Sequence, residues 1–200
     1  MPSPLGHALG GIAAAWAMDL VPGRRAWRTA APTASFYERV GGHLTIACAG
    51  LGALADADLL FGVHRTASHS FTAAALVTIV AAAVTGRVTG GRAPVRRVAW
   101  MCGAAYASHL LLDWMAIHRF PPFGLQLLWP FSRQWFISGW DLFPQTQRNR
   151  VLSAAAVRVN LNAFAWESAI LLPVVALLWS VRVKALARFA AKIPGGNHST

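Results

Sequence analysis

Charge is scarce in this chain of 200 residues, of which only 12% are charged and 56% are hydrophobic. Soluble globular proteins carry about 25% charged residues, so this composition argues against a cytosolic enzyme. It also excludes intrinsic disorder, a collagen and a coiled coil. Cysteine is nearly absent, because only Cys48 and Cys102 occur and both lie within apolar stretches. We therefore infer neither a disulfide framework nor the ligand spacing of a zinc finger.

Acidic residues are outnumbered by basic ones, with seven Asp and Glu against eighteen Lys and Arg, which gives a net charge of +11. Such an excess can indicate nucleic-acid binding, but here the basic residues are spread over several loops without a recognition motif. In a chain this apolar, the excess is typical of the cytoplasmic loops of a membrane protein.

Five apolar stretches approach the roughly 20 residues that a membrane-spanning helix needs. They cover residues 5–21, 41–61, 70–88, 98–115 and 161–181, and each is rich in alanine and glycine, which allow close helix packing. No signal-peptide pattern is evident, so we expect the first stretch to be retained. The sequence predicts an all-α, multi-span transmembrane bundle that forms one domain over residues 1–193, followed by a disordered tail at 194–200.

Basic-rich and basic-poor loops alternate along the chain. By the positive-inside rule, this alternation predicts an extracytoplasmic N-terminus and a cytoplasmic C-terminal tail. The long connection at 116–160 would then lie outside, and it contains Trp129, Trp135 and Trp140. Tryptophan at this density is typical of a membrane interface. We expect this loop either to lie on the bilayer as an amphipathic segment or to form a compact cap on the helices.

Most ionisable residues of the apolar stretches and of the short loop at 62–69 fall on the outer, extracytoplasmic side of the membrane in this orientation, so we expect a metal site at that face. They are His7, Asp56, Asp58, His64, His69, His109 and Asp113. Successive spans run in opposite directions, so sequence spacing alone would not produce this grouping. Ionisable groups at membrane depth are costly and usually functional.

The residue types in this group are suited to a transition metal. His109 and Asp113 are four residues apart and so share one helix face. Imidazole together with carboxylate suits zinc, manganese or iron better than calcium. Seven candidates fit two ions, or one ion whose ligands are oriented by neighbours.

Each part of the group also has a structural explanation. His109 and Asp113 could be a buried hydrogen-bonded pair, the two acids at 56 and 58 a helix cap, and the two histidines at 64 and 69 part of a polar loop. Of two further acids, one (Glu167) lies near this group and the other (Asp19) lies at the opposite end of the spans. Glu167 could be an additional ligand or the partner of an arginine, and we expect Asp19 to pair with Arg24 and Arg25.

The order of the segments PLGHALGG, DAD, HRTASHS, SHLLLDW and GLQLLWPFSRQWF resembles the YdjM-type family of bacterial inner-membrane proteins, described as membrane-bound metal-dependent hydrolases. The resemblance covers residues 4–141 and implies a helical membrane protein whose metal site is formed by the seven residues above. The HxxxD pair is also similar to that of zinc-dependent phospholipase C. The family usually has proline before the first acid of DAD, where this chain has Ala55, so we expect the helix to end less sharply there.

We therefore expect a hydrolase of the bacterial inner membrane in which a metal-activated water attacks an ester or phosphoester. The position of the site at the membrane edge suggests a lipid or lipid-linked substrate. Asp56 or Asp58 could act as general base, and Arg65 and Arg133 could hold a phosphate, unless they are interfacial anchors. The alternatives are a metal transporter or sensor, disfavoured by the apolar inner halves of the spans, and a non-catalytic protein with a structural metal.

Overall fold

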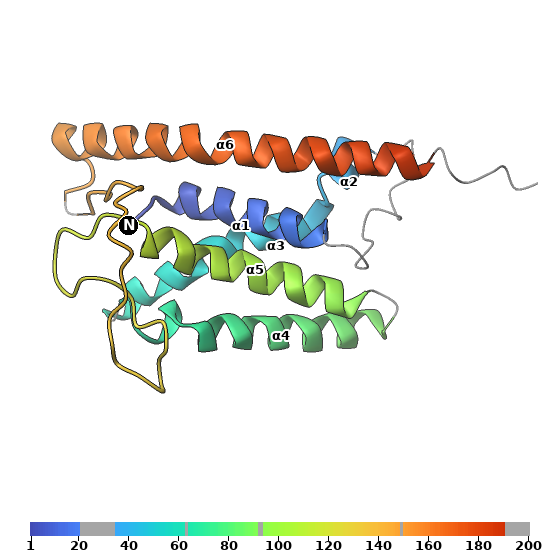
Figure 1. Cartoon of the computed structure of the whole chain (residues 1–200), viewed down its shortest axis with the longest axis horizontal. Coiled ribbons are helices and arrows are strands. Elements are labelled where there is room, and N and C mark those ends of the chain that lie inside the picture. Colours follow the sequence, from blue (N-terminus) through green and yellow to red (C-terminus); the bar gives the residue numbers. More distant parts are fainter. Residues whose placement is uncertain (21–34, 63, 92–93, 149, 191–200) are drawn as a thin grey trace, which may run out of the picture.

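The computed structural model describes residues 1–20, 35–62, 64–91, 94–148 and 150–190. Its long helices are α1 (Pro4–Asp19), α3 (Gly42–Leu54), α4 (Phe71–Thr89), α5 (Val95–Trp114) and α6 (Ala154–Ala190); shorter elements are α2 (Phe36–Arg39) and the 3-10 helices η2 (Ala55–Phe61) and η3 (Ala67–His69). The long helices lie side by side, with α6 along one edge of the bundle and α4 along the other (Figure 1). The all-α prediction is confirmed, whereas the predicted tail at 194–200 lies outside the described residues.

Each predicted span falls on one of the five long helices, but they differ in apolar length. Three segments of the described chain are long and apolar enough to cross a membrane, namely Gly42–Phe61, Phe71–Thr89 and Ala154–Arg182. Helix α1 has only 16 residues, and α5 begins with arginines and ends with His109 and Asp113. These two helices bury eight and eleven residues, whereas α4 buries only Ala74. The two long helices that are not among these three candidate segments are therefore the most buried part of the bundle.

Small residues allow the inner helices to approach closely. Gly52 of α3 faces Gly11 of α1, and a methyl group on Gly52 would overlap the carbonyl oxygen of His7. This contact fixes α3 against the first turns of α1. Helix α3 then continues into η2 without a break, with Ala55 buried at the junction, as we expected from the missing proline.

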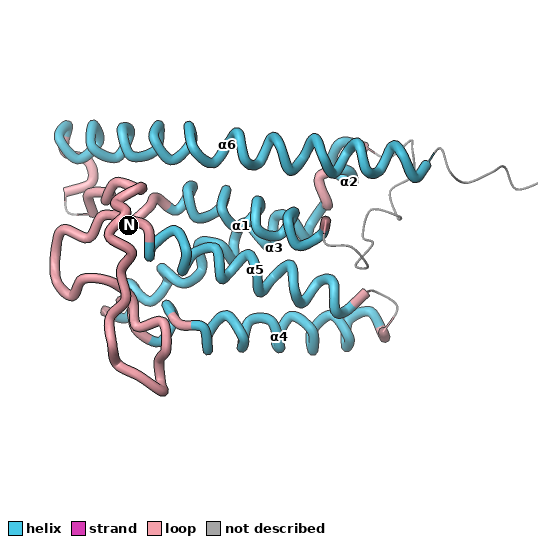
Figure 2. Tube along the Cα trace, viewed as in Figure 1, coloured by secondary structure: helices cyan, strands magenta, loops and turns pink. Residues whose placement is uncertain are grey.

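The loop after α5 packs over one end of the bundle, as in the second of the two predicted alternatives; that it also lies on a bilayer stays a prediction. We call its described residues between 116 and 148 the cap. Isolated bridges pair Ala116 with Phe143 and Leu125 with Phe136, and Leu125 and Phe143 are buried. The N-terminus and most of the irregular segments gather at this same end of the helices (Figure 2).

The opposite end of the inner helices is held by buried charges. Asp19, at the end of α1, accepts hydrogen bonds from Arg97 Nε at 2.7 Å and Arg97 Nη2 at 3.0 Å. Arg182 Nη2 of α6 lies 3.3 Å from the same carboxylate. The partners expected for Asp19, at positions 24 and 25, lie outside the described residues.

Candidate metal centre

All seven predicted residues meet at the cap end of the bundle. His7 comes from the first turn of α1, the two acids at 56 and 58 from η2, and His109 and Asp113 from the last turns of α5. His64 lies in the connection between η2 and η3, and His69 ends η3. The close packing of α1 on α3, and the central position of α5, bring these elements to one place.

Four of these side chains direct one atom each toward a common point. Asp56, His69, His109 and Asp113 offer ligand atoms that all lie within 4.8 Å of one another. The Nε2 atoms of His69 and His109 are 3.1 Å apart. Asp56 Oδ1 lies 3.7 Å from the Nε2 atom of His69 and 3.6 Å from that of His109. Asp113 Oδ2 lies 3.4 and 3.5 Å from the same two atoms.

These spacings fit a tetrahedral transition-metal ion. Metal–ligand bonds of roughly 2.0–2.2 Å place tetrahedral ligand atoms about 3.3–3.6 Å apart. Asp56 Oδ1 and both oxygens of Asp113 are buried and have no hydrogen-bond partner. Buried carboxylate oxygens are costly unless they are paired or coordinate a cation. The donor set, its spacing and its unsatisfied oxygens therefore agree with a possible metal-binding cluster.

The two histidines of the cluster are oriented by their other ring nitrogens. His109 Nδ1 lies 2.8 Å from the carbonyl oxygen of Gly52, to which it donates when protonated. His69 Nδ1 lies 3.1 Å from Asp58 Oδ2. Both arrangements leave Nε2 to the cluster, as in metal sites where a carbonyl or carboxylate holds the ligand ring.

Asp58, His64 and His69 form a second possible cluster, but its carboxylate is already well satisfied. Asp58 pairs with His64 Nδ1 at 2.8 Å and accepts from the Ser68 hydroxyl and from the Arg65 backbone N–H. Its contacts thus differ from those of the first cluster, where three carboxylate oxygens have no hydrogen-bond partner. Asp58 has the surroundings of a residue that orients histidines.

His7 packs against two residues of the first cluster, His109 and Asp113. Its ring stacks on that of His109, with centroids 3.7 Å apart and planes 14° from parallel. Its Nε2 lies 3.3 Å from Asp113 Oδ1 and 3.9 Å from Asp56 Oδ2. Both ring nitrogens are buried without a hydrogen-bond partner.

His64 and His69, which both precede α4, have opposite pKa directions. Burial disfavours the charged form of His69, but contacts with Asp113, Asp56 and Asp58 outweigh it and raise its pKa to about 10. For His64, burial dominates over the hydrogen bond to Asp58 and lowers the pKa. His69 therefore holds a proton in the metal-free centre, while His64 is neutral at pH 7.

The comparisons with known proteins agree with this picture of a helical membrane protein. The model of the YdjM inner membrane protein family matches residues 1–188. The chain belongs to this family. No curated relative and no solved structure matches it. The family match and the apolar helices together support location in the inner membrane.

In this YdjM-family chain, the two predicted phosphate-binding arginines have different positions. Arg65 is buried, and its Nη1 donates to the carbonyl oxygen of Pro122 at 3.2 Å, so it ties the histidine motif to the cap. Arg133 is exposed, and its backbone carbonyl accepts from Gln126 Nε2. A phosphate-binding role for these two residues stays a prediction.

Sequence reasoning missed the arginine that reaches the centre of this YdjM-family protein. Arg148 Nη2 lies 3.8 Å from Asp56 Oδ1, and its Nη1 lies 3.5 Å from His64 Nε2. It stands in the loop without a motif around it, so only the folding of the cap brings it to the site. Glu167 has a partner that we did not expect, because it accepts hydrogen bonds from the Ser3 backbone and hydroxyl.

Proposed function

We propose that this YdjM-family protein is a membrane-bound metal-dependent hydrolase that acts on an ester or phosphoester. The observation that carries the proposal is the set of four donors at metal-ligand spacing, in which three carboxylate oxygens are buried without a hydrogen-bond partner. A pocket of about 820 Å³ adjoins this set and shares Asp56 with it, so a substrate could reach the centre.

One divalent ion would be held by Asp56, His69, His109 and Asp113. Zinc is the ion that we propose for these imidazole and carboxylate ligands, and manganese and iron are the alternatives. The bound ion would supply Lewis acidity and an activated water to the reaction. Asp58 would act as the positioning residue that keeps His69 Nε2 turned toward the ion.

A proton acceptor stands beside this set. His64 is neutral at pH 7 because of its burial, and its Nδ1 is paired with Asp58. Its Nε2 faces Arg148 and the sulfur of Met1 at the side of the centre. We assign to His64 Nε2 the uptake of the proton that a nucleophilic water must lose, with Asp58 stabilising the resulting charge. Asp58, predicted as a base, thus acts through the histidine.

Transport fits the described part of the bundle less well than hydrolysis. Between the metal centre and the Asp19 end lies an apolar core made of Ala15, Cys48, Met101, Cys102 and Ala105. An ion pathway needs polar groups through the membrane. A purely structural metal would use the four donors but would leave the adjoining pocket without a role.

The test compares the purified native protein with the double variant His109→Ala plus Asp113→Ala. Metal content is measured by elemental mass spectrometry, and turnover with chromogenic ester and phosphodiester substrates. We expect one transition-metal equivalent and metal-dependent turnover in the native protein, both lost in the folded double variant. The matched control, His43→Ala plus Asp141→Ala, changes the same residue types away from the centre and should keep both.

Absence of stoichiometric metal after reconstitution with zinc, manganese or iron would refute the proposal. Bound metal without turnover on any ester or phosphoester would favour a structural metal site instead.

A further inference from the structure

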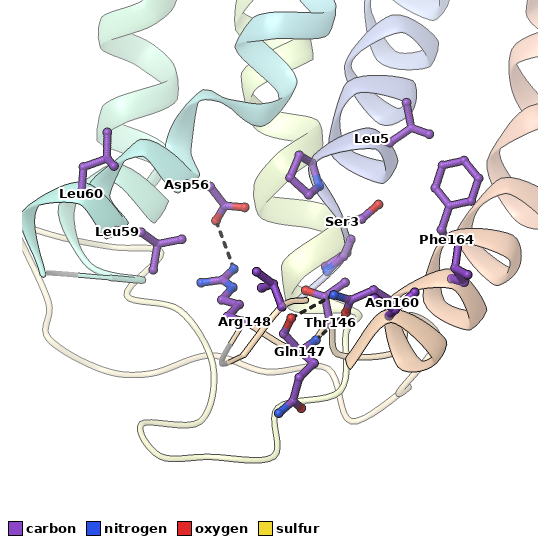
Figure 3. A pocket seen from close by; sticks show the side chains of 15 residues that line it. Ser3, Leu5, Asp56, Leu59, Leu60, Thr146, Gln147, Arg148, Asn160 and Phe164 are labelled. Carbon is purple, nitrogen blue, oxygen red and sulfur yellow. Dashed lines mark hydrogen bonds and ion pairs between the residues drawn. The ribbon is translucent and has the colours of Figure 1, made fainter. Parts of the chain in front are cut away.

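The pocket beside the metal centre has two apolar sides and a polar floor. Leu59 and Leu60 of η2 lie on one side, and Leu5 of α1 and Phe164 of α6 on the other (Figure 3). Its volume of about 820 Å³ is within the range of about 300–1,000 Å³ that is usual for small-molecule sites.

The apolar sides belong to segments that can cross a membrane. Leu59 and Leu60 fall within Gly42–Phe61, and Leu161 and Phe164 fall within Ala154–Arg182. Leu60 is 85% exposed and Leu161 61% exposed. In a bilayer, such side chains face lipid rather than water. An occupant could therefore enter sideways from the hydrocarbon region.

The polar floor carries one cation and one cluster residue. The guanidinium of Arg148 is partly exposed and contacts Asp56 at 3.8 Å, as the dashed line in Figure 3 shows. Arginine pairs with phosphate through two parallel hydrogen bonds. Loop residue Gln147 and helix residue Asn160 exchange hydrogen bonds of 2.7 and 3.0 Å, which tie the Arg148 segment to α6. The cation is thereby held at the inner end of an apolar pocket.

We propose that this pocket binds an anionic phospholipid, with the phosphate at Arg148 and an acyl chain along Leu59, Leu161 and Phe164. Charge complementarity selects the anionic group, and the lipid-facing sides select the acyl chain. The bound headgroup then lies next to Asp56. As a statement about substrate class, the inference rests on the proposed hydrolase function; as a statement about binding, it can be tested alone.

The test measures binding of tail-labelled fluorescent phosphatidylglycerol and phosphatidylcholine to the full chain in detergent, without any turnover. We expect phosphatidylglycerol to bind more tightly. Arg148→Gln should weaken its binding about tenfold and remove the preference, because a hydrogen bond to a charged group is lost. Leu161→Trp should weaken the binding of both lipids, because the larger side chain fills the pocket.

Two matched controls use exposed residues of α6 that do not line the pocket. Arg158→Gln removes an arginine, and Leu177→Trp adds the same indole. Both control variants should bind the two lipids with the affinities of the native protein. All four variants are checked for folding by thermal unfolding.

Equal affinity for the two lipids, or an unchanged affinity in Arg148→Gln, would overturn the proposal. Equal losses in Arg148→Gln and Arg158→Gln would indicate general attraction to anionic surfaces and would also overturn it. Competition by glycerol phosphate as strong as that by the lipid would mean that the apolar sides contribute nothing.

The outcomes separate the two proposals. If the lipid binds as expected but no ester or phosphoester is cleaved, the hydrolase proposal fails and the lipid site stands. If soluble esters are cleaved but Arg148→Gln leaves lipid affinity unchanged, the lipid site fails and the hydrolase stands.

Discussion

Asp58→Asn tests whether Asp58 orients a ligand or binds an ion itself. Asp58 contacts one residue of the four-donor set, His69, at 3.1 Å, while its remaining contacts go to His64, Ser68 and the Arg65 backbone. Loss of such an orienting carboxylate usually costs 10- to 100-fold in metal affinity. Asparagine keeps one acceptor oxygen, so we expect the lower end, about tenfold, which is about 1.4 kcal/mol.

The assay is competition with a chelator of known zinc affinity, followed by elemental mass spectrometry. We expect one bound equivalent both in the native protein and in Asp58→Asn, with only the affinity changed. The control is Asp141→Asn, which removes an exposed acid of the cap and should leave the affinity unchanged.

This reasoning would be refuted if the native protein bound two equivalents of metal and Asp58→Asn bound one. Asp58 would then hold a second ion together with His64 and His69. An unchanged affinity in Asp58→Asn would show that the contact with His69 does not orient the ring.

Three further predictions concern stability, each measured by thermal unfolding in detergent. Gly52→Ala should destabilise the protein by about 1–3 kcal/mol, because the added methyl group overlaps the carbonyl oxygen of His7. The control Gly50→Ala, in the same helix but in open space, should not destabilise it in this way. Equal losses of stability in the two variants would argue against the close helix contact. Asp19→Asn should cost about 3–5 kcal/mol, since it leaves buried arginine charge uncompensated, yet keep the metal content; a native melting temperature would contradict the buried ion pairs. The pKa of His69 is raised to about 10. Stabilisation of the metal-free protein by charged His69 is therefore complete below about pH 6.5 and is lost as the pH rises through 10. His69→Gln should remove this pH dependence of stability, and a pH dependence that persists in the variant would belong to another group.

Much of the centre could be predicted because its pattern is local. The spacing of His109 and Asp113 places both on one helix face, and the alternating direction of the helices brings DAD and HRTASHS to the same end as His7. The small residues of the apolar stretches likewise predict close packing, as at Gly52.

The remaining features depend on contacts between distant parts of the chain. Asp19 pairs with Arg97 and Arg182, and no periodicity connects these positions. The ring of His109 is oriented by a backbone carbonyl, which has no signature in the sequence. The cap is irregular, so the approach of Arg148 to Asp56 follows only from its tertiary folding.

The two ends of the bundle neutralise buried acid in different ways. At one end, Arg97 and Arg182 are part of the chain, so the charge of Asp19 is balanced as soon as the helices assemble. At the other end, Asp56 and Asp113 keep buried oxygens without hydrogen-bond partners. Their charge is met in part by Arg148, 3.8 Å from Asp56, and by the proton on His69, and the proposed metal ion would take the place of that proton. If the proposed ion binds, the charge balance of the cap end depends on metal supply. Protein made under metal starvation should be cleaved by protease within the cap first, while the Asp19 end stays intact.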